Sequence, residues 1–296
     1  MENKVLFKPG HTACAGCGQA IAARLVLEVA GANTIVANNT GCLEVFTTRF
    51  PETAWNVPWI HSLFENSAAV ASGIEAALKY LGKKDTTHVI AQGGDGGTAD
   101  IGLQALSGML ERGHDILYVC YDNEAYMNTG IQRSGLTPLD TDTTTSPAGS
   151  QSLGNPHQKK PMPEIANAHG IPYVATASAA FPQDLQRKVK KALSIKGPKY
   201  IQVHVPCPLG WRHEPGKTIE VGKLAVETGL YPLIEYENGV LVAKRQITPK
   251  PAEEYLKAQG RFRHLLNNPQ AIREVQAVAD NNIRKYGLKA ETQTTT

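Results

Sequence analysis

Two apolar runs of strand length, separated by glycines and a helical segment, constrain the fold of this chain most strongly. The runs are residues 88–91, HVIA, and 115–121, DILYVCY. Both are short and rich in β-branched or aromatic residues, as buried strands are. Residues 98–112 place apolar side chains largely on one side of a helix, and Gly113 follows as a C-cap glycine. The stretch therefore predicts a strand–helix–strand unit of a parallel sheet.

A carboxylate and a carboxamide follow these two strands. Asp95 stands in Gly94-Asp95-Gly96, and Asn123 comes directly after the second strand. Open α/β sheets bind ligands at the carboxyl ends of their strands, so we expect both side chains at one mouth. Their oxygens suit Mg²⁺ beside a diphosphate, and glycines let backbone N–H groups approach phosphates. An ordinary glycine-rich turn is the alternative interpretation.

Four of the five cysteines have positions typical of metal ligands. Cys14 and Cys17 form a C-x-x-C pair, while Cys42 and Cys207 each follow a predicted strand. Four thiolates suit zinc or an iron–sulfur cluster, and the spacing does not choose between them. A thioredoxin-type dithiol fits less well, because no strand precedes the pair. Cys120 lies inside an apolar strand and is expected to be a small buried hydrophobe.

The rest of the chain continues the alternation of helices and strands. Helices are expected at residues 18–29, 64–81, 163–169 and 181–195, and strands at 34–37, 173–176 and 199–205. Residues 44–61 read as irregular. Residues 123–161 also lack a regular element, which in a compact domain is typical of a functional loop. The fold class is therefore α/β, with a mostly parallel sheet flanked by helices over residues 1–210.

The pattern changes in residues 211–296. A helix is expected at 218–228, a hairpin at 233–236 and 240–244, and charged helices from 249 onward. We interpret this region as a C-terminal helical and hairpin extension that contacts a partner subunit. The polar end, 291–296, is expected to be disordered.

Composition excludes several classes of protein. The formal charge of +3 is small and scattered, which does not favour nucleic acid. No apolar run approaches the roughly 18 residues of a membrane span, so no membrane is expected. The N-terminal residues lack the apolar region of a signal peptide, which predicts a cytoplasmic protein. In that compartment, five cysteines indicate metal or redox chemistry before structural disulfides.

A set of motifs in a fixed order covers nearly the whole chain and is similar to one family. GDG at 94–96, followed by DNE at 122–124 and NTG at 128–130, resembles the thiamine diphosphate motif. Together with further motifs, it resembles the β subunits of 2-oxoacid:ferredoxin oxidoreductases, of the pyruvate synthase type. The further motifs are CAGCG at 14–18, TGCLE at 40–44, WIH at 59–61, FEN at 64–66, TP at 137–138 and PCP at 206–208.

The resemblance implies an activity and a set of cofactors. The activity is oxidative decarboxylation of a 2-oxo acid, pyruvate above all, with coenzyme A as acyl acceptor and ferredoxin as electron acceptor. The cofactors are thiamine diphosphate, Mg²⁺ and one [4Fe–4S] cluster. The implied ligands of Mg²⁺ are Asp95, Asn123 and the Ala125 carbonyl, and Asn128 is implied to lie beside the reacting carbons. The implied cofactor-binding residues are Gly94, Asp95, Gly96, Asn123, Ala125 and Asn128, and the implied cluster ligands are Cys14, Cys17, Cys42 and Cys207.

The chain carries only part of this machinery. It has no second cysteine array to pass electrons to ferredoxin, and no position for the glutamate that activates the cofactor. The resemblance therefore implies α, γ and δ partner subunits, with the cofactor at a subunit interface. Two alternatives stay open: the same chemistry on a branched-chain 2-oxo acid, phenylglyoxylate or oxalate, and a zinc-stabilised scaffold subunit without catalysis.

Overall fold

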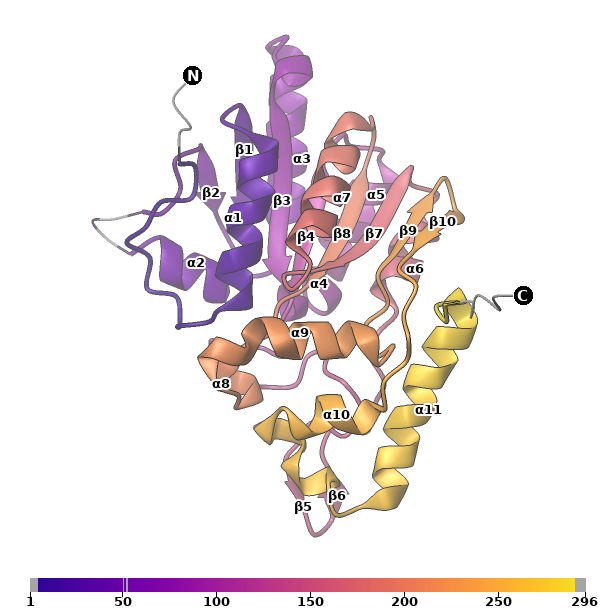
Figure 1. Cartoon of the computed structure of the whole chain (residues 1–296). Coiled ribbons are helices and arrows are strands. Elements are labelled where there is room, and N and C mark those ends of the chain that lie inside the picture. The colour runs from indigo at the N-terminus through magenta and orange to yellow at the C-terminus, as the bar shows by residue number, and fades with distance from the viewer. Residues whose placement is uncertain (1–4, 50, 52, 291–296) are drawn as a thin grey trace.

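The predicted strand–helix–strand unit is present in the computed structural model, which describes residues 5–49, 51 and 53–290 (Figure 1). Strand β3 (His88–Gly94) pairs in parallel with β4 (Leu117–Asp122). Gly113 has φ 70° and donates to Leu110, as a C-cap glycine does. The unit therefore has the order that the sequence predicts.

The single helix predicted between these strands is wrong in its first turns. The structure has α4 (Asp95–Ala99) and α5 (Leu103–Glu111), separated by residues 100–102. A Cβ on Gly102 would lie 1.9 Å from the carbonyl oxygen of Gly97. The helix is interrupted here because the backbone at Gly102 passes too close to that at Gly97 to leave room for a side chain.

Eight strands form one sheet in the order β10-β9-β7-β8-β4-β3-β1-β2. Neighbouring strands from β7 to β2 are parallel, while β9 is antiparallel to β7 and β10 to β9, so the prediction of a mostly parallel sheet is confirmed. A two-stranded ribbon, β5 (Ala148–Gly149) with β6 (Ser152–Leu153), lies apart. The remaining strands are β1 (Thr34–Asn38), β2 (Trp59–His61), β7 (Tyr173–Ser178), β8 (Lys199–His204), β9 (Ile234–Glu237) and β10 (Val240–Lys244).

Helices cover both faces of the sheet (Figure 1). On one face α1 (Gly18–Ala30) packs against α7 (Pro182–Ser194). On the other lie α3 (Ser67–Tyr80), α5 and α6 (Met162–Asn167). The strand side chains alternate between two apolar cores, so that Ile90 belongs to one core and Ala91 to the other.

A third apolar core lies beyond the carboxyl ends of the strands (Figure 1). It contains residues of the four helices α8 (Pro208–Trp211), α9 (Thr218–Glu227), α10 (Ala252–Lys257) and α11 (Pro269–Tyr286). The predicted hairpin is also present: β9 and β10 pair around Asn238 and Gly239, both with positive φ. Residues 211–296 thus extend the sheet as well as adding helices. Three short 3-10 helices are η1 (Lys84–Thr86), η2 (Pro215–Lys217) and η3 (Gly260–Leu265).

Of the two stretches predicted to lack regular elements, one contains a helix and a strand and the other is mostly irregular. Residues 44–61 contain most of a short helix, α2 (Cys42–Thr47), and the edge strand β2, so the prediction of an irregular segment is wrong there. Residues 123–161 contain only β5 and β6, as predicted for a long loop. The expected disorder of residues 291–296 lies outside the described residues.

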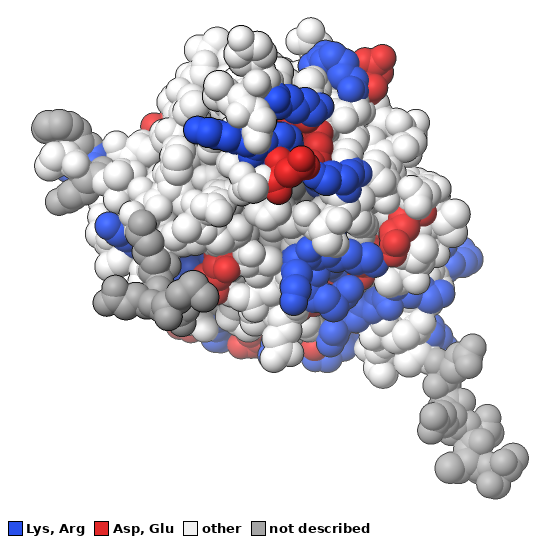
Figure 2. All heavy atoms as spheres, turned by 90° about the horizontal axis from the view of Figure 1, so that it is seen from above, with Lys and Arg blue, Asp and Glu red and all other residues white. Residues whose placement is uncertain are grey.

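Ion pairs join neighbouring strands at the amino ends of the sheet. Asp115 is bonded to Lys84 at 2.7 Å and to Lys199 at 2.5 Å. Figure 2 looks onto this end of the molecule and shows groups of Lys and Arg with Asp and Glu beside most of them, separated by wide uncharged areas. Among the described residues, no helix combines the length and the apolar character needed to cross a bilayer.

Candidate active site

The neighbouring parallel strands β1, β3 and β4 all have their carboxyl ends at the same end of the sheet. The chain leaves β1 for β2 on one side, whereas β3 lies on the other side of β1. Such a switch point is where open α/β sheets bind ligands. Asn39, which directly follows β1, accepts from the Ser67 amide at 2.8 Å and donates to the Gly97 carbonyl at 3.1 Å. Asn39 thereby fixes the exit of β1 against α3 and α4, a role that the sequence did not reveal.

Asp95 and Asn123, predicted at one mouth, are in contact. The inward-facing terminal atom of the Asn123 amide lies 2.8 Å from the Ala125 carbonyl oxygen and 2.9 Å from Asp95 Oδ1. With its nitrogen inward, the amide donates to both oxygens. With its oxygen inward, three oxygens meet, and a proton on Asp95 or a bound cation satisfies them. Adjacent ligands of octahedral Mg²⁺ are about 2.9 Å apart, since Mg–O bonds are about 2.0–2.1 Å.

Asp95 is buried, with 1% of its surface exposed. Burial, followed by the nearby Asp122 carboxylate, raises the pKa of Asp95 well above its usual value. Ser134 Oγ donates to the second carboxylate oxygen, Oδ2. One oxygen of Asp95 is therefore fixed by Ser134, while the other faces Asn123.

The glycines of this site have two separate roles. A Cβ on Gly96 would lie 2.2 Å from the Tyr126 ring, so Gly96 is required for packing. A Cβ on Gly94 would meet nothing within 4 Å. Gly94 thus leaves open space at the end of β3, where a ligand can approach the backbone.

A cavity of about 30 Å³ lies between these segments. It is about the volume that one water molecule takes up in the liquid, far less than a cofactor needs. The residues around it therefore form one wall of a larger site. They are Gln19, residues 40–42, Phe64, residues 94–97, Asn123 and residues 125–129.

Asn128 lies on a closed loop at the rim of this cavity. The loop is held by the Tyr126 amide donating to Gln132 O and by the Ile131 amide donating to Tyr126 O, both at 2.9 Å. The Asn128 side chain is exposed, and no hydrogen bond to it occurs among the described residues. Its amide is free to meet a ligand.

The four predicted cluster cysteines share one neighbourhood. Burial, followed by the thiols of Cys207 and Cys17, raises the pKa of Cys42 to about 12. Burial likewise raises the pKa of Cys17 to about 11, and the thiols of Cys207 and Cys14 add to this rise. All are free thiols. Within the described residues, no three His, Cys, Asp or Glu side chains converge closely enough to hold a single ion.

Backbone amides face two of these sulfurs. Those of Gln19 and Ala20, in the first turn of α1, point to Cys17, and those of Leu209 and Gly210 point to Cys207. Amides in such positions stabilise thiolates and tune the potential of a bound cluster. Cys42 also lines the cavity of about 30 Å³ described above, which we call the cofactor cavity. The four thiols therefore lie next to the site formed by Asp95 and Asn123. Cys120 is fully buried in the core of β4, as predicted.

Comparison with known proteins assigns the chain to a family. Residues 39–203 match the thiamine pyrophosphate enzyme, C-terminal TPP binding domain. The pyruvate synthase subunit PorB of Methanosarcina barkeri is 58% identical over 97% of this chain and 98% of its own length. That of Methanocaldococcus jannaschii is 60% identical over 95% of this chain and 96% of its own. The chain belongs to the PorB family of 2-oxoacid:ferredoxin oxidoreductase subunits.

Two further relatives add detail. The ketoisovalerate oxidoreductase subunit VorB of Pyrococcus abyssi is 52% identical over 88% of this chain and 86% of its own length. A 2-oxoglutarate:ferredoxin oxidoreductase structure from Magnetococcus marinus aligns with a TM-score of 0.59 at 22% identity, over 75% of this chain and 81% of that one. The latter supports the thiamine diphosphate-binding fold. Members of this family are catalytic oxidoreductase subunits, and so is this chain.

A buried ion-pair cluster supports the segment that carries Asn123 and Ala125. Lys159 Nζ lies 2.8 Å from Asp122 Oδ2 and 2.7 Å from Glu124 Oε1, and Arg261 Nη2 lies 2.5 Å from Glu124 Oε2. Burial favours a protonated Glu124, but Lys159 and Arg261 outweigh it and lower its pKa to about 2. Lys159, in the long loop of residues 123–161, is therefore paired within the protein.

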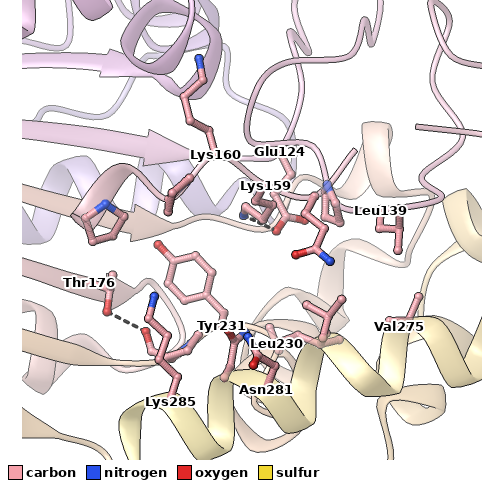
Figure 3. Close-up of a pocket in the computed structure, with 18 of the residues that line it drawn as sticks. Glu124, Leu139, Lys159, Lys160, Thr176, Leu230, Tyr231, Val275, Asn281 and Lys285 are labelled. Atoms are coloured by element: carbon pink, nitrogen blue, oxygen red, sulfur yellow. Dashed lines mark hydrogen bonds and ion pairs between the residues drawn. The ribbon is translucent and has the colours of Figure 1, made fainter. Parts of the chain in front are cut away.

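A second cavity of about 350 Å³ lies on the side of Glu124 and Lys159 (Figure 3). Its walls come from the loop before α6, the ends of β7 and β8, and α11. Glu124 and Lys159 are paired at this cavity, with Tyr231 and Leu230 nearby. Asn123 and Ala125 line the cofactor cavity, so the segment 122–125 separates the two spaces.

Proposed function

We propose that this chain is the β subunit of a pyruvate:ferredoxin oxidoreductase, which oxidatively decarboxylates pyruvate with coenzyme A as acyl acceptor. It works in the cytoplasm with α, γ and δ partner subunits and passes electrons to ferredoxin. The single observation that carries this proposal is the junction of two sites: Cys42 lines the cavity next to the oxygens of Asp95 and Asn123, and it lies among the other three thiols.

Three protein oxygens fit Mg²⁺ in this site. Asp95 Oδ1, Asn123 Oδ1 and the Ala125 carbonyl would hold the ion, with two diphosphate oxygens and one water completing an octahedron. Gly94 leaves space beside them, and Gly96 keeps Tyr126 close to α4. The residues present therefore fit the metal and the diphosphate of thiamine diphosphate.

Thiamine diphosphate supplies a nucleophilic carbon that attacks the keto carbon of a 2-oxo acid. The chain's own residues bind and orient. Asn128, five residues beyond Asn123, is exposed at the cavity rim and can donate to the substrate carboxylate or keto oxygen as charge develops there. The buried ion pairs of Glu124 keep the loop in place behind it.

The thiols of Cys14, Cys17, Cys42 and Cys207 would hold one [4Fe–4S] cluster, which would accept electrons. Zinc with bonds of about 2.3 Å requires sulfurs about 3.8 Å apart around one point. Here the thiols share a neighbourhood, yet no three converge on one ion within the described part of the chain. This arrangement supports a larger cluster, whose thiolate ligands the backbone amides at Cys17 and Cys207 would stabilise.

Iron analysis of cysteine variants tests the cluster. Cys42→Ala should lose most of the iron and acid-labile sulfide from anaerobically purified protein, because it removes a ligand that also lines the cofactor cavity. Cys120→Ala is the matched control and should retain both, since Cys120 lies in the core of the sheet. Stoichiometric zinc without iron in the parent protein would contradict the proposal.

A second candidate keeps the chemistry and changes the substrate. The VorB relative, a ketoisovalerate oxidoreductase subunit, is 52% identical, close to the identities of the PorB relatives. A panel of pyruvate, ketoisovalerate, phenylglyoxylate and oxalate on the intact complex, with a viologen dye as acceptor, decides between them. We expect the highest kcat/KM for pyruvate, and a clear preference for ketoisovalerate would establish the second candidate.

A further inference from the structure

One buried polar atom of a residue at this cavity has no hydrogen-bond partner among the described residues. Gln19 lies in the first turn of α1, two residues after Cys17, and only 3% of its surface is exposed. Its Oε1 atom is buried without a hydrogen bond, and Gln19 is one of the residues around the cavity, with Thr40, Cys42 and Asn128. Leaving a buried acceptor unpaired costs free energy. A ligand that donates a hydrogen bond to Gln19 Oε1 would remove this cost.

The chemistry of the occupants restricts what that donor is. The diphosphate belongs with Asp95 and Asn123, and it offers oxygens, as does the anion of a 2-oxo acid. The one N–H donor of thiamine diphosphate is the 4′-amino group of its aminopyrimidine ring. An unpaired acceptor in this cavity therefore complements the one part of the cofactor that donates.

We infer that the Gln19 side-chain oxygen accepts a hydrogen bond from the 4′-amino group of thiamine diphosphate. This inference rests on the proposed function and deepens it by adding a cofactor-binding residue outside Gly94–Asn128. The backbone amide of Gln19 faces the Cys17 sulfur, and the same residue borders the cavity. One residue thus joins the cluster loop to the aminopyrimidine ring and orients the amino group next to the reacting carbon.

Binding of two cofactors tests the contact directly. The assembled complex is freed of cofactor under anaerobic conditions, and quenching of tryptophan fluorescence gives Kd for thiamine diphosphate and for 4′-deamino-thiamine diphosphate, both with Mg²⁺. In the parent complex the natural cofactor should bind about tenfold more tightly than the analogue. Gln19→Met, close in shape but without an acceptor, should raise Kd for the natural cofactor about tenfold and change Kd for the analogue less than twofold.

Two variants control for indirect effects. Gln19→Glu retains an acceptor oxygen and should restore most of the preference for the natural cofactor. Gln92→Met changes another buried glutamine, which accepts from Tyr121 and does not line the cavity, and it should leave the preference unchanged. Iron content should stay at the parent level in all variants, because only the backbone of Gln19 faces the cluster loop.

The outcomes separate the inference from the proposed function. If Gln19→Met weakens both cofactors equally, or neither, the inference is wrong. If the parent complex binds neither cofactor, the proposed function itself fails. Loss of iron from Gln19→Met would show a structural role at Cys17 and would also overturn the inference.

Discussion

At the scale of single residues, Asp95 should decide whether the cofactor stays bound. Asp95→Ala removes one of three oxygens around the proposed Mg²⁺ and opens a cavity where Ser134 now donates. We expect the complex to lose thiamine diphosphate during gel filtration in Mg²⁺ buffer, measured as cofactor per chain. Ser134→Ala leaves all three oxygens in place and should retain the cofactor. Full retention by Asp95→Ala would place the metal elsewhere.

Asn128 should matter to turnover more than to binding. Its side chain is exposed, makes no hydrogen bond to a described residue and lies at the cavity rim, five positions beyond the proposed metal ligand. Losing one donor to developing charge costs about a hundredfold to a thousandfold in rate. We therefore expect Asn128→Ala to bind thiamine diphosphate with a Kd within about twofold of the parent and to have a kcat at least about a hundredfold lower. Normal kcat would make Asn128 a turn residue only.

His204 should make the fold sensitive to acid. It is fully buried between the rings of Trp211 and Tyr231, and neither ring nitrogen has a hydrogen bond. Burial, with help from Lys159 and Arg261 and against Glu124, lowers its pKa from 6.5 to about 3. Below pH 6.5 this histidine is protonated in the unfolded chain but stays neutral in the folded chain. The free energy of unfolding therefore decreases as the pH falls from 6.5 towards 3.

The slope for one proton is about 1.4 kcal/mol per pH unit. His204→Gln should remove this contribution, so its melting temperature should fall less steeply than that of the parent between pH 6.5 and 5. The stability that Glu124 contributes is fully present above its ordinary pKa of 4.5 and is lost only as the pH falls towards its folded pKa of about 2, outside this window. If the melting temperatures of the parent and the variant fell equally steeply with pH, His204 would not be the source of the acid sensitivity.

Residues with a local signal could be predicted, and residues joined by tertiary contact could not. Asp95, Asn123 and the cysteines stand in short motifs at strand ends, which the sequence displays. The ion-pair cluster joins Glu124 to Arg261, 137 positions away, and Arg261 stands in no motif. Gln19 follows the cysteine pair, but only its missing partner in three dimensions draws attention to it.

At the scale of elements, the break between α4 and α5 should depend on Gly102. A Cβ there would lie 1.9 Å from the Gly97 carbonyl oxygen, a backbone atom that cannot turn away. We expect Gly102→Ala to lower the free energy of unfolding by at least about 2 kcal/mol, measured by urea denaturation. Gly73, inside α3, is the matched control, because a Cβ there meets nothing within 4 Å. Gly73→Ala should raise stability by about 0.5–1 kcal/mol.

The elements that the sequence predicts are those with their own periodicity. The strands β3 and β4 are apolar runs, and α7 has one apolar face toward the sheet. The three-residue strand β2 has no such pattern and exists because it pairs with β1. The interruption of the predicted 98–112 helix arises from the close approach of Gly102 to Gly97, which periodicity does not encode.

At the scale of the whole molecule, the chain forms only one part of an active site. The sheet places the oxygens of Asp95 and Asn123, the Asn128 side chain and four thiols at one end. The cavity among them measures about 30 Å³, and none of its lining residues is a glutamate that could activate the aminopyrimidine ring. Cys14 and Leu209, beside the other thiols, are exposed. These features indicate that a partner subunit supplies the other wall of the site.

The isolated chain should therefore be inactive. Without the second wall, thiamine diphosphate has metal ligands but no enclosure, and without the activating glutamate its reacting carbon loses a proton slowly. Without a further cysteine array, electrons have no route to ferredoxin. We expect no pyruvate-dependent viologen reduction by the purified chain with thiamine diphosphate, Mg²⁺ and coenzyme A, and recovery of activity when the partner subunits are added anaerobically. Oxidation of pyruvate at the full rate by the chain alone would show that its own residues complete the site.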